Sequence, residues 1–170
     1  MHTTRIPARI AAQDSDHLTA VWHETVVTVF RGPATLQAVL NIGRTCEGLL
    51  AAARGPVTYL SVIERSSPAP TETVRRELAT WSRDVVTRLA LAVIVAEGGG
   101  FKNALVRGVG VALTVLLPHK VPFKFVNSVP EGASLLAPFL PENGGGPPAL
   151  SAAIDAVRQR WHGSVNGAVG

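Results

Sequence analysis

Two glutamates stand where an α/β protein usually carries its chemistry. Glu64 and Glu97 each follow an apolar run that is typical of a buried strand, and α/β folds place their sites at the carboxyl ends of such strands. Two carboxylates there could do acid–base work. Strand-end glutamates more often pair with arginines, such as Arg65 or Arg107 here. Catalysis by Glu64 and Glu97 is therefore the last of three functional hypotheses.

The second candidate is a glycine-rich corner that follows the second strand. Gly98, Gly99 and Gly100 lead into a predicted helix, with Lys102 near its start. The spacing fails the phosphate-loop pattern GxxxxGK[ST] and, because Asn103 stands where the third glycine belongs, the dinucleotide pattern GxGxxG. The glycines are then either a tight corner or a cradle for a small anion or other ligand at a helix N-terminus.

The other reactive side chains form no catalytic or metal-binding pattern. Ser66 and Ser67 lie in a linker and outside any GxSxG elbow, and Cys46 is the only cysteine, predicted to be a buried, inert thiol. No ligand pair such as HExxH is found among the five histidines, which are His2, His17, His23, His119 and His162. We therefore expect no catalytic residue, no metal and no cofactor.

Composition narrows the class of protein further. The chain has 170 residues, 46% of them hydrophobic, and a net charge of +4. A chain of this length and hydrophobic content is large enough to form one core. The sequence contains no run of five like charges, so its charge pattern gives no indication of nucleic-acid binding. The most apolar span, 103–117, is shorter than the roughly 20 residues of a membrane helix, and the N-terminus lacks the apolar stretch of a signal peptide. We expect a cytoplasmic protein.

Periodicity predicts strands alternating with helices. The expected elements are a hairpin at 17–32 with a tight turn near His23–Glu24, strands at 57–63, 91–97 and 122–128, and helices at 34–53, 71–90, 101–117, 131–140 and 149–161. This order favours an α/β fold: a mostly parallel or mixed central sheet of about five strands, with an N-terminal hairpin and with helices packed on it. The expected divisions are an N-terminal extension 1–16, the α/β domain 17–140, a linker 141–148, a C-terminal helix 149–162 and a disordered tail 163–170.

The helices show three apolar stripes that predict buried faces. The first is Leu36, Leu40, Gly43, Glu47 and Leu50, apolar apart from Glu47, with Val39 and Leu49 beside it. The second is Val74, Leu78, Trp81, Val85 and Leu89, and the third is Leu150, Ile154, Val157 and Trp161. Helix 101–117 is apolar on all sides, with Val106, Val109, Leu113 and Leu116 opposite its core face. Either the chain itself covers that side, or a homodimer or partner does, or a lipid. We expect the C-terminal helix to dock there.

The segments 26-VVTVFRG-32, 55-GPVTYLSVIERSSPAPTETVRRE-77 and 91-LAVIVAEGGGFKNALVRGVGVALTVL-116 resemble STAS domains, the SpoIIAA-like fold of anti-sigma-factor antagonists and of sulfate-transporter tails. They are most similar to a single-domain myxobacterial subgroup, and the likeness covers about 17–140. The resemblance implies a partner-switch turn whose serine is phosphorylated. Ser66, Ser67 and Thr71 occupy that turn, although the family's Asp and Gly-Leu are missing from it.

These observations predict a non-enzymatic regulatory or protein-interaction domain that acts through a protein partner or a homodimer. The alternative is a binding module for a small anion, a nucleotide or a lipid, with the cradle at Gly98 to Lys102. The third hypothesis is an enzyme that uses the two strand-end glutamates.

Overall fold

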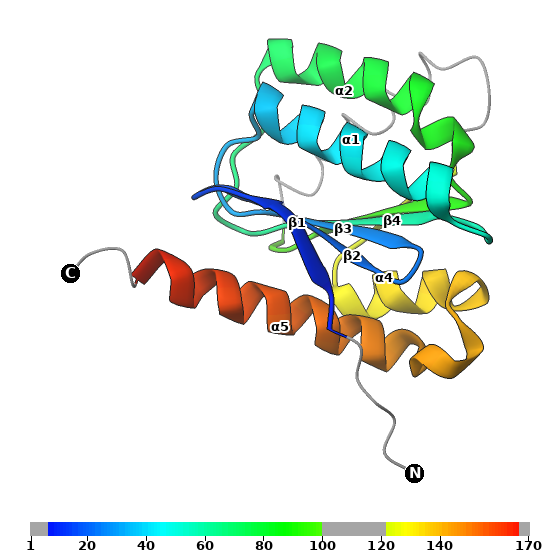
Figure 1. The fold of residues 1–170 in the computed structure, drawn as a ribbon. Coiled ribbons are helices and arrows are strands. Elements are labelled where there is room, and N and C mark those ends of the chain that lie inside the picture. The colour runs from blue at the N-terminus through cyan, green and yellow to red at the C-terminus, as the bar shows by residue number, and fades with distance from the viewer. Residues whose placement is uncertain (1–6, 100–121, 167–170) are drawn as a thin grey trace.

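The computed structural model describes residues 7–99 and 122–166, with the backbone alone for 162–166. Its centre is one six-stranded sheet, whose strands lie side by side in chain order (Figure 1). The strands are β1 (Arg9–Gln13), β2 (His17–Trp22), β3 (Thr25–Phe30), β4 (Thr58–Ile63), β5 (Leu91–Ala96) and β6 (Phe123–Val126). The first three strands are antiparallel and β3 to β6 are parallel. The predicted mixed sheet and N-terminal hairpin are confirmed.

The sheet has one strand more than the sequence predicted. β1 lies inside the segment expected to be an extension outside the fold, and it pairs with β2 through a register shift between Ile10 and Ala12. Only Ile10 and Ala12 of this strand are half-buried, and the other three residues are exposed. Alternation over five residues with two small members is a weak strand signal, and pairing with β2 is what makes the segment a strand.

The hairpin between β2 and β3 has the expected two-residue turn. Trp22 is paired with Thr25, and His23 takes a positive φ of 50° between them. Two-residue hairpin turns need this left-handed backbone, which matches the twist of the flanking strands. All six residues of β3 are buried, because helices cover both of its faces.

The helices form two layers, one on each face of the sheet (Figure 1). Helices α1 (Leu36–Ala52) and α2 (Glu72–Asp84) cover one face, and α4 (Val129–Leu136) and α5 (Gly146–Asn166) cover the other. Short 3₁₀ turns follow α2 and α4, at Val86–Arg88 and Ala137–Phe139, and a third precedes α5 at Glu142–Gly144. Thr35, Thr71 and Ser128 cap the first three helices with their hydroxyl oxygens.

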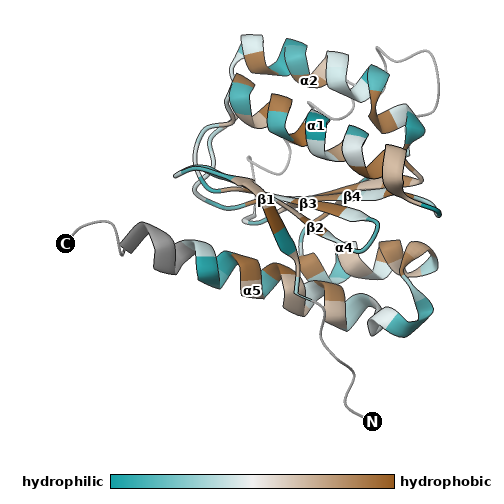
Figure 2. Cartoon of the chain, viewed as in Figure 1, coloured by the Kyte–Doolittle hydropathy of each residue, from teal (hydrophilic) through white to brown (hydrophobic). Residues whose placement is uncertain are grey.

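Two hydrophobic cores result, separated by the sheet. In Figure 2, brown residues are frequent on the strands and teal residues on α2. The predicted stripe of α2 is confirmed: Val74 and Trp81 are buried, Leu78 is partly buried, and Val85 and Leu89 follow buried beyond the helix. Those side chains meet β4, where Tyr59 contacts Trp81 edge to face at 5.2 Å.

The predicted stripe of α1 is only partly correct: Val39 is buried and Leu49 and Leu50 are partly buried, but its first two members are not. The helix turns Ala38, Val39, Ile42 and Cys46 into the core. Leu36 and Leu40, which headed the predicted stripe, remain 45% and 44% exposed. The helix carries more apolar residues than one face needs, so periodicity cannot choose between adjacent stripes.

Two further positions of the predicted α1 stripe, Gly43 and Glu47, lie against α2 and the 3₁₀ turn that follows it. A side chain at Gly43 would lie 3.5 Å from Trp81, and Glu47 pairs with Arg88 at 2.8 Å. The short side chain of Ala38 and the two β-branched residues beside it allow the helix to lie close to the strands.

The C-terminal helix packs on the sheet face opposite α1 and α2. Its stripe of Leu150, Ile154, Val157 and Trp161 is buried as predicted, in the core that includes β2 and α4. The expected linker 141–148 is a 3₁₀ turn followed by the start of α5, with Gly145 and Gly146 at positive φ. The backbone of α5 is helical through residue 166, into the segment expected to be a disordered tail.

The expected docking surface of α5, helix 101–117, lies outside the described residues, as do Val106, Val109, Leu113 and Leu116. The surface on which α5 does pack is the sheet itself, together with α4. The predicted contact of α5 with helix 101–117 stays a prediction. The apolar stripe identified which residues of the tail are buried, and the sheet decided what they are buried against.

Candidate functional site

Three charged residues lie side by side at the carboxyl ends of three neighbouring parallel strands. Arg31, Glu64 and Glu97 are the first residues after β3, β4 and β5. The ladder continues one step past the strands, because Glu64 N donates to Phe30 O and Glu97 N donates to Ile63 O, both at 2.9 Å. Parallel strands that end in register bring these side chains to the same edge. The expectation that Glu64 and Glu97 lie at strand ends is confirmed.

A single arginine from α5 joins the two carboxylates. Arg158 Nη1 and Nη2 donate to the two oxygens of Glu97 at 2.8 and 2.9 Å. Its Nε donates to Glu64 Oε1 at 3.0 Å. This two-pronged contact uses the planar geometry of the guanidinium, which a lysine could not reproduce. Helix α5 is thereby fastened to the ends of β4 and β5.

Arg31 completes the cluster from the other side. Its Nε donates to Glu64 Oε2 at 3.0 Å, and its guanidinium carbon lies 3.9 Å from the centre of the Trp161 ring. Trp161 in turn donates from Nε1 to Asp14 O at 2.8 Å. The cation stacks on the aromatic face in the geometry of a cation–π contact. We call Arg31, Glu64, Glu97 and Arg158, with Trp161, the strand-end cluster.

Burial and charge act against each other in the cluster. The four charged side chains retain between 12% and 29% of their exposure. Burial alone would raise the pKa of Glu64, but hydrogen bonds from Arg31 and the charges of Arg158 and Arg31 outweigh it, so its pKa lies below the ordinary value. Burial likewise opposes the charge of Arg158, whose pKa is nevertheless raised by the carboxylates of Glu97 and Glu64.

This arrangement favours the anionic form of Glu64, whose pKa is lowered. A general acid needs a raised carboxyl pKa and a general base needs a lone pair open to substrate, whereas both oxygens of Glu64 and of Glu97 accept hydrogen bonds from arginines. Two positive and two negative side chains also leave the cluster without net charge. Its chemistry is that of a structural clasp between α5 and the sheet.

The arginines that hydrogen-bond to Glu64 and Glu97 in the strand-end cluster are Arg31 and Arg158, which the sequence analysis did not name. Arg107 lies outside the described residues, and Arg65 is exposed and lies beside Gly98. Arg31 and Arg158 were missed because they are 33 and 94 residues from Glu64 in sequence. One signal was present: Arg158 directly follows Val157 and stands three residues before Trp161, on the edge of the apolar stripe of α5.

The three hydroxyls of the predicted partner-switch turn have structural contacts. Ser66 is exposed and donates to Arg31 O at 2.7 Å, and Ser67 is buried and donates to Gly32 O at 2.9 Å. Thr71 accepts from Val74 N as the N-cap of α2. The turn therefore ties the end of β4 to the end of β3, next to the strand-end cluster.

The predicted anion cradle is described only at its start. Gly98 has a φ of 103°, which only glycine adopts easily, and a Cβ there would come within 3.3 Å of Arg65 Cγ. Gly99 has open space around it. Gly100 and Lys102 lie outside the described residues.

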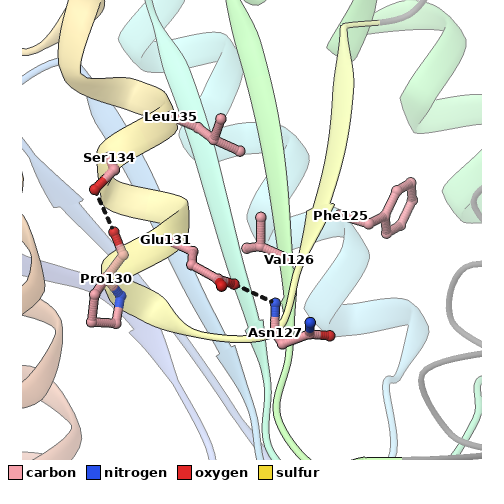
Figure 3. Close-up of a pocket in the computed structure, with 7 residues that line it drawn as sticks. All are labelled: Phe125, Val126, Asn127, Pro130, Glu131, Ser134 and Leu135. Atoms are coloured by element: carbon pink, nitrogen blue, oxygen red, sulfur yellow. Dashed lines mark hydrogen bonds between the residues drawn. The ribbon is translucent and has the colours of Figure 1, made fainter.

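A shallow groove lies at the far edge of the sheet, between β6 and α4 (Figure 3). It is lined by Phe125, Val126, Asn127, Pro130, Glu131, Ser134 and Leu135. Glu131 Oε2 accepts from Asn127 N at 3.1 Å, and Ser128 accepts from Glu131 N at 3.4 Å. These two bonds secure the start of α4 against the end of β6, in the manner of a capping box.

Several hydrogen-bonded polar side chains of β2, β3 and β4 are buried under α1. Thr28 bonds to Tyr59 Oη at 2.8 Å and to Ser61 Oγ at 3.0 Å, across β3 and β4. His17 Nε2 bonds to Thr19 Oγ1 at 2.7 Å, and no hydrogen-bond partner is recorded for its Nδ1. Burial lowers the pKa of His17 to about 4, although the charge of Asp14 acts to raise it.

Cys46 is buried beside these side chains, as predicted. Burial, followed by the charge of Glu47, raises the pKa of its thiol to about 12. A thiol in that state is a poor nucleophile. Among the residues that the structure describes, no three His, Cys, Asp or Glu side chains are grouped as metal ligands, and none of the helices searched there has the length and apolarity to cross a bilayer.

No family model matches this chain, and no curated protein does. One solved structure is similar: an uncharacterised protein from Shewanella loihica, of the DUF3478 family and described as having a SpoIIAA-like fold. The similarity covers 76% of this chain and 91% of that one, at 15% identity and a TM-score of 0.48. The fold type named for that protein is the one that the STAS resemblance implied.

Proposed function

We propose that this protein is a non-enzymatic, cytoplasmic regulatory domain that acts through contacts with another protein. The observation that carries the proposal is that the carboxylate oxygens of Glu64 and Glu97 all accept hydrogen bonds from arginines. Arg158 binds both glutamates, and Arg31 binds Glu64. In an α/β fold the strand ends are the usual place for catalysis, and here the protein's own helix α5 occupies that edge. The two glutamates described at these strand ends are thus engaged by arginines of the protein itself, which supports a role other than acid–base catalysis.

Exposed apolar side chains support a role in protein contacts. Within the described residues, the exposed large hydrophobic side chains are Leu36 and Leu40 on α1 and Leu135 on α4. Single exposed leucines are common on any protein. Two of these three share a helix face at a spacing of four residues, and the third lines the groove beside β6. They lie on opposite faces of the sheet, which offers two surfaces to partners.

The test is quantitative affinity capture with the full chain from an extract of its host. We expect a reproducible set of captured proteins that is reduced by Leu36→Glu with Leu40→Glu, or by Leu135→Glu. Glu97→Gln is the matched control, since the proposal gives its carboxylate no role outside the clasp, and it should leave the set unchanged. All variants are compared at temperatures where circular dichroism shows them folded.

A second experiment tests whether the protein is an enzyme instead. The chain would be incubated with a small-molecule extract, and the products followed by mass spectrometry. Conversion of any component that Glu64→Gln or Glu97→Gln abolishes, in variants that stay folded, would contradict the proposal.

The ligand-binding alternative has its own measurement. A ligand at 100 times its dissociation constant stabilises a protein by about 2.7 kcal/mol, which is a visible thermal shift. Inorganic phosphate, ATP, GTP and NAD should each leave the melting temperature unchanged. A shift with one of them that Gly98→Ala removes would favour the cradle over the protein-interaction role.

A further inference from the structure

Strand β6 is the edge of the sheet opposite β1, and its backbone is arranged to accept another strand. It pairs with β5, in register Ala92 with Phe123 and Ile94 with Phe125. Pro122 O accepts from Ala92 N at 2.8 Å, so the backbone groups of Pro122 point toward β5. Since successive residues of a strand direct these groups to opposite sides, those of Phe123 and Phe125 point away from β5, to the side on which no described strand lies. We call this side the open edge.

The two edge strands of the sheet, β1 and β6, differ in the regularity of their pairing. At β1 the register shifts between Ile10 and Ala12, and Arg160 of α5 donates to Ala8 O at 2.9 Å. Irregular edges of this kind resist the addition of a strand. No register shift interrupts the pairing of β6. Within the described residues, no strand lies on its outer side. Of the two edges, β6 is the one fitted for pairing.

The length of this open edge is set by a side chain of α4. Asn127 N is the next amide that alternation directs outward, and Glu131 Oε2 already accepts from it at 3.1 Å (Figure 3). The carboxylate therefore takes the place that a partner carbonyl would otherwise occupy. Pairing is confined to Phe123 and Phe125, which together offer two N–H and two C=O groups. An edge of this length suits a short extended segment and a weak, reversible contact.

The side chains around the edge define what that segment should carry. Lys124 is exposed, and Val126 faces the same side of the sheet two residues later, toward the groove with Leu135 (Figure 3). Phe123 and Phe125 stack on the opposite side, with ring centres 6.2 Å apart. A neighbouring strand places alternate residues on each side. It would set an acidic residue beside Lys124, an aliphatic residue beside Val126, and an apolar residue between them beside the rings.

We propose that β6 binds an extended segment of a partner protein as an added strand, with an acidic and an aliphatic residue two positions apart facing Lys124 and the Val126–Leu135 groove. This inference rests on the proposed function and gives it a surface and a partner chemistry. Main-chain hydrogen bonds supply affinity in such strand addition, and the alternate side chains supply specificity.

Two labelled peptides test the proposal with the full chain. They are acetyl-Thr-Glu-Val-Leu-Thr-amide and its reverse, acetyl-Thr-Leu-Val-Glu-Thr-amide, for parallel and antiparallel addition. Fluorescence anisotropy should show binding of one of them, weakened about tenfold by Lys124→Glu through charge repulsion. A peptide with Lys in place of Glu should recover that loss. Arg76→Gln, a change at an exposed residue of α2 on the other face, should change nothing.

A backbone test separates strand addition from simple side-chain contact. Phe125→Pro removes an outward N–H and leaves the bonds to β5 in place, since proline is tolerated on edge strands. Phe125→Ala removes the ring and keeps the N–H. Binding should be weaker for the proline variant than for the alanine variant. Peptide should also slow hydrogen exchange of the Phe125 amide in the wild type, while the Lys124 amide, directed to β5, stays as it was.

Several outcomes would overturn the inference. Neither peptide binding at millimolar concentration, or binding that ignores both Lys124→Glu and Phe125→Pro, would exclude this edge. A dimer in sedimentation that Lys124→Glu dissociates would make the occupant a second copy rather than a partner. Partner capture that depends on Leu36 and Leu40 but not on Lys124 would refute strand addition while leaving the proposed function intact.

Discussion

Arg158 is the residue on which the strand-end cluster depends. It supplies hydrogen bonds to both carboxylates, whereas Arg31 reaches Glu64 alone among the two glutamates. Removing it would leave Glu97 partly buried without its bidentate partner. A buried charge that loses its partner costs more than the pair contributed while intact.

The change Arg158→Gln should therefore destabilise the protein by about 2–3 kcal/mol, the low end for a broken buried pair because these side chains are partly exposed. Arg76→Gln is the matched control. It removes an exposed i,i+4 contact with Glu72 and should cost at most about 0.5 kcal/mol. Urea denaturation at pH 7 gives both values. Equal effects of the two changes would show that the cluster is no stronger than a surface pair.

His17 should make stability depend on pH in a separate window. Its folded pKa of about 4 lies below its ordinary 6.5, so the folded state binds fewer protons between these values. Stability is then complete above pH 6.5 and falls as the pH drops toward 4, by on the order of 3 kcal/mol in all. Glu64, whose folded pKa is also lowered, adds a loss only below its ordinary value of 4.5.

Denaturation of wild type and His17→Gln at pH 7.5, 6.5, 5.5, 4.5 and 3.5 separates the two groups. The variant should lose most of the slope between pH 6.5 and 4.5, because glutamine does not titrate, and should keep the acid loss below that range. An unchanged slope in the variant would mean that His17 is not the group responsible.

At the scale of the element, α1 shows why two neighbouring stripes must be tested separately. Ile42 is buried under the sheet-facing side, and Leu40 is exposed. Ile42→Ala should cost about 2–4 kcal/mol, since it removes buried methylene groups and leaves a cavity. Leu40→Ala should change the free energy of unfolding by less than about 1 kcal/mol. The midpoints of urea unfolding compare them, and a larger effect at Leu40 would restore the face predicted from the sequence.

At the scale of the whole molecule, α5 closes the second helical layer. Leu150, Ile154, Val157 and Trp161 are almost fully buried, and each such side chain contributes about 1.5–3 kcal/mol when removed from water. Their sum is comparable with the 5–15 kcal/mol that stabilises a typical domain. The helix is thus part of the domain rather than an appendage to it.

A chain that ends at Pro141 should therefore fail to reach the native state. We expect loss of the near-ultraviolet circular dichroism signal and aggregation on size-exclusion chromatography. Addition of a peptide spanning residues 146–166 should recover part of the signal, since it would refill the same face. A truncated chain that keeps the native spectrum and elution volume would show that the remaining layers suffice.

Most of the elements can be predicted from the sequence, because their signals are local. Continuous β-branched runs made β4 and β5 recognisable, and the turn at His23 marked the hairpin. The sequence also indicated that Glu64 and Glu97 both lie at the carboxyl ends of strands. Parallel strands that end together place the residues that follow them side by side.

Tertiary structure alone decided the rest, because it depends on contacts between segments far apart in the chain. Arg158 reaches Glu64 across 94 residues, and no spacing rule connects them. The face of α1 was chosen by which of two apolar stripes could lie closest to the strands. β1 became a strand only because β2 offered an edge to pair with. Periodicity shows which residues can be buried, and packing determines which of them are.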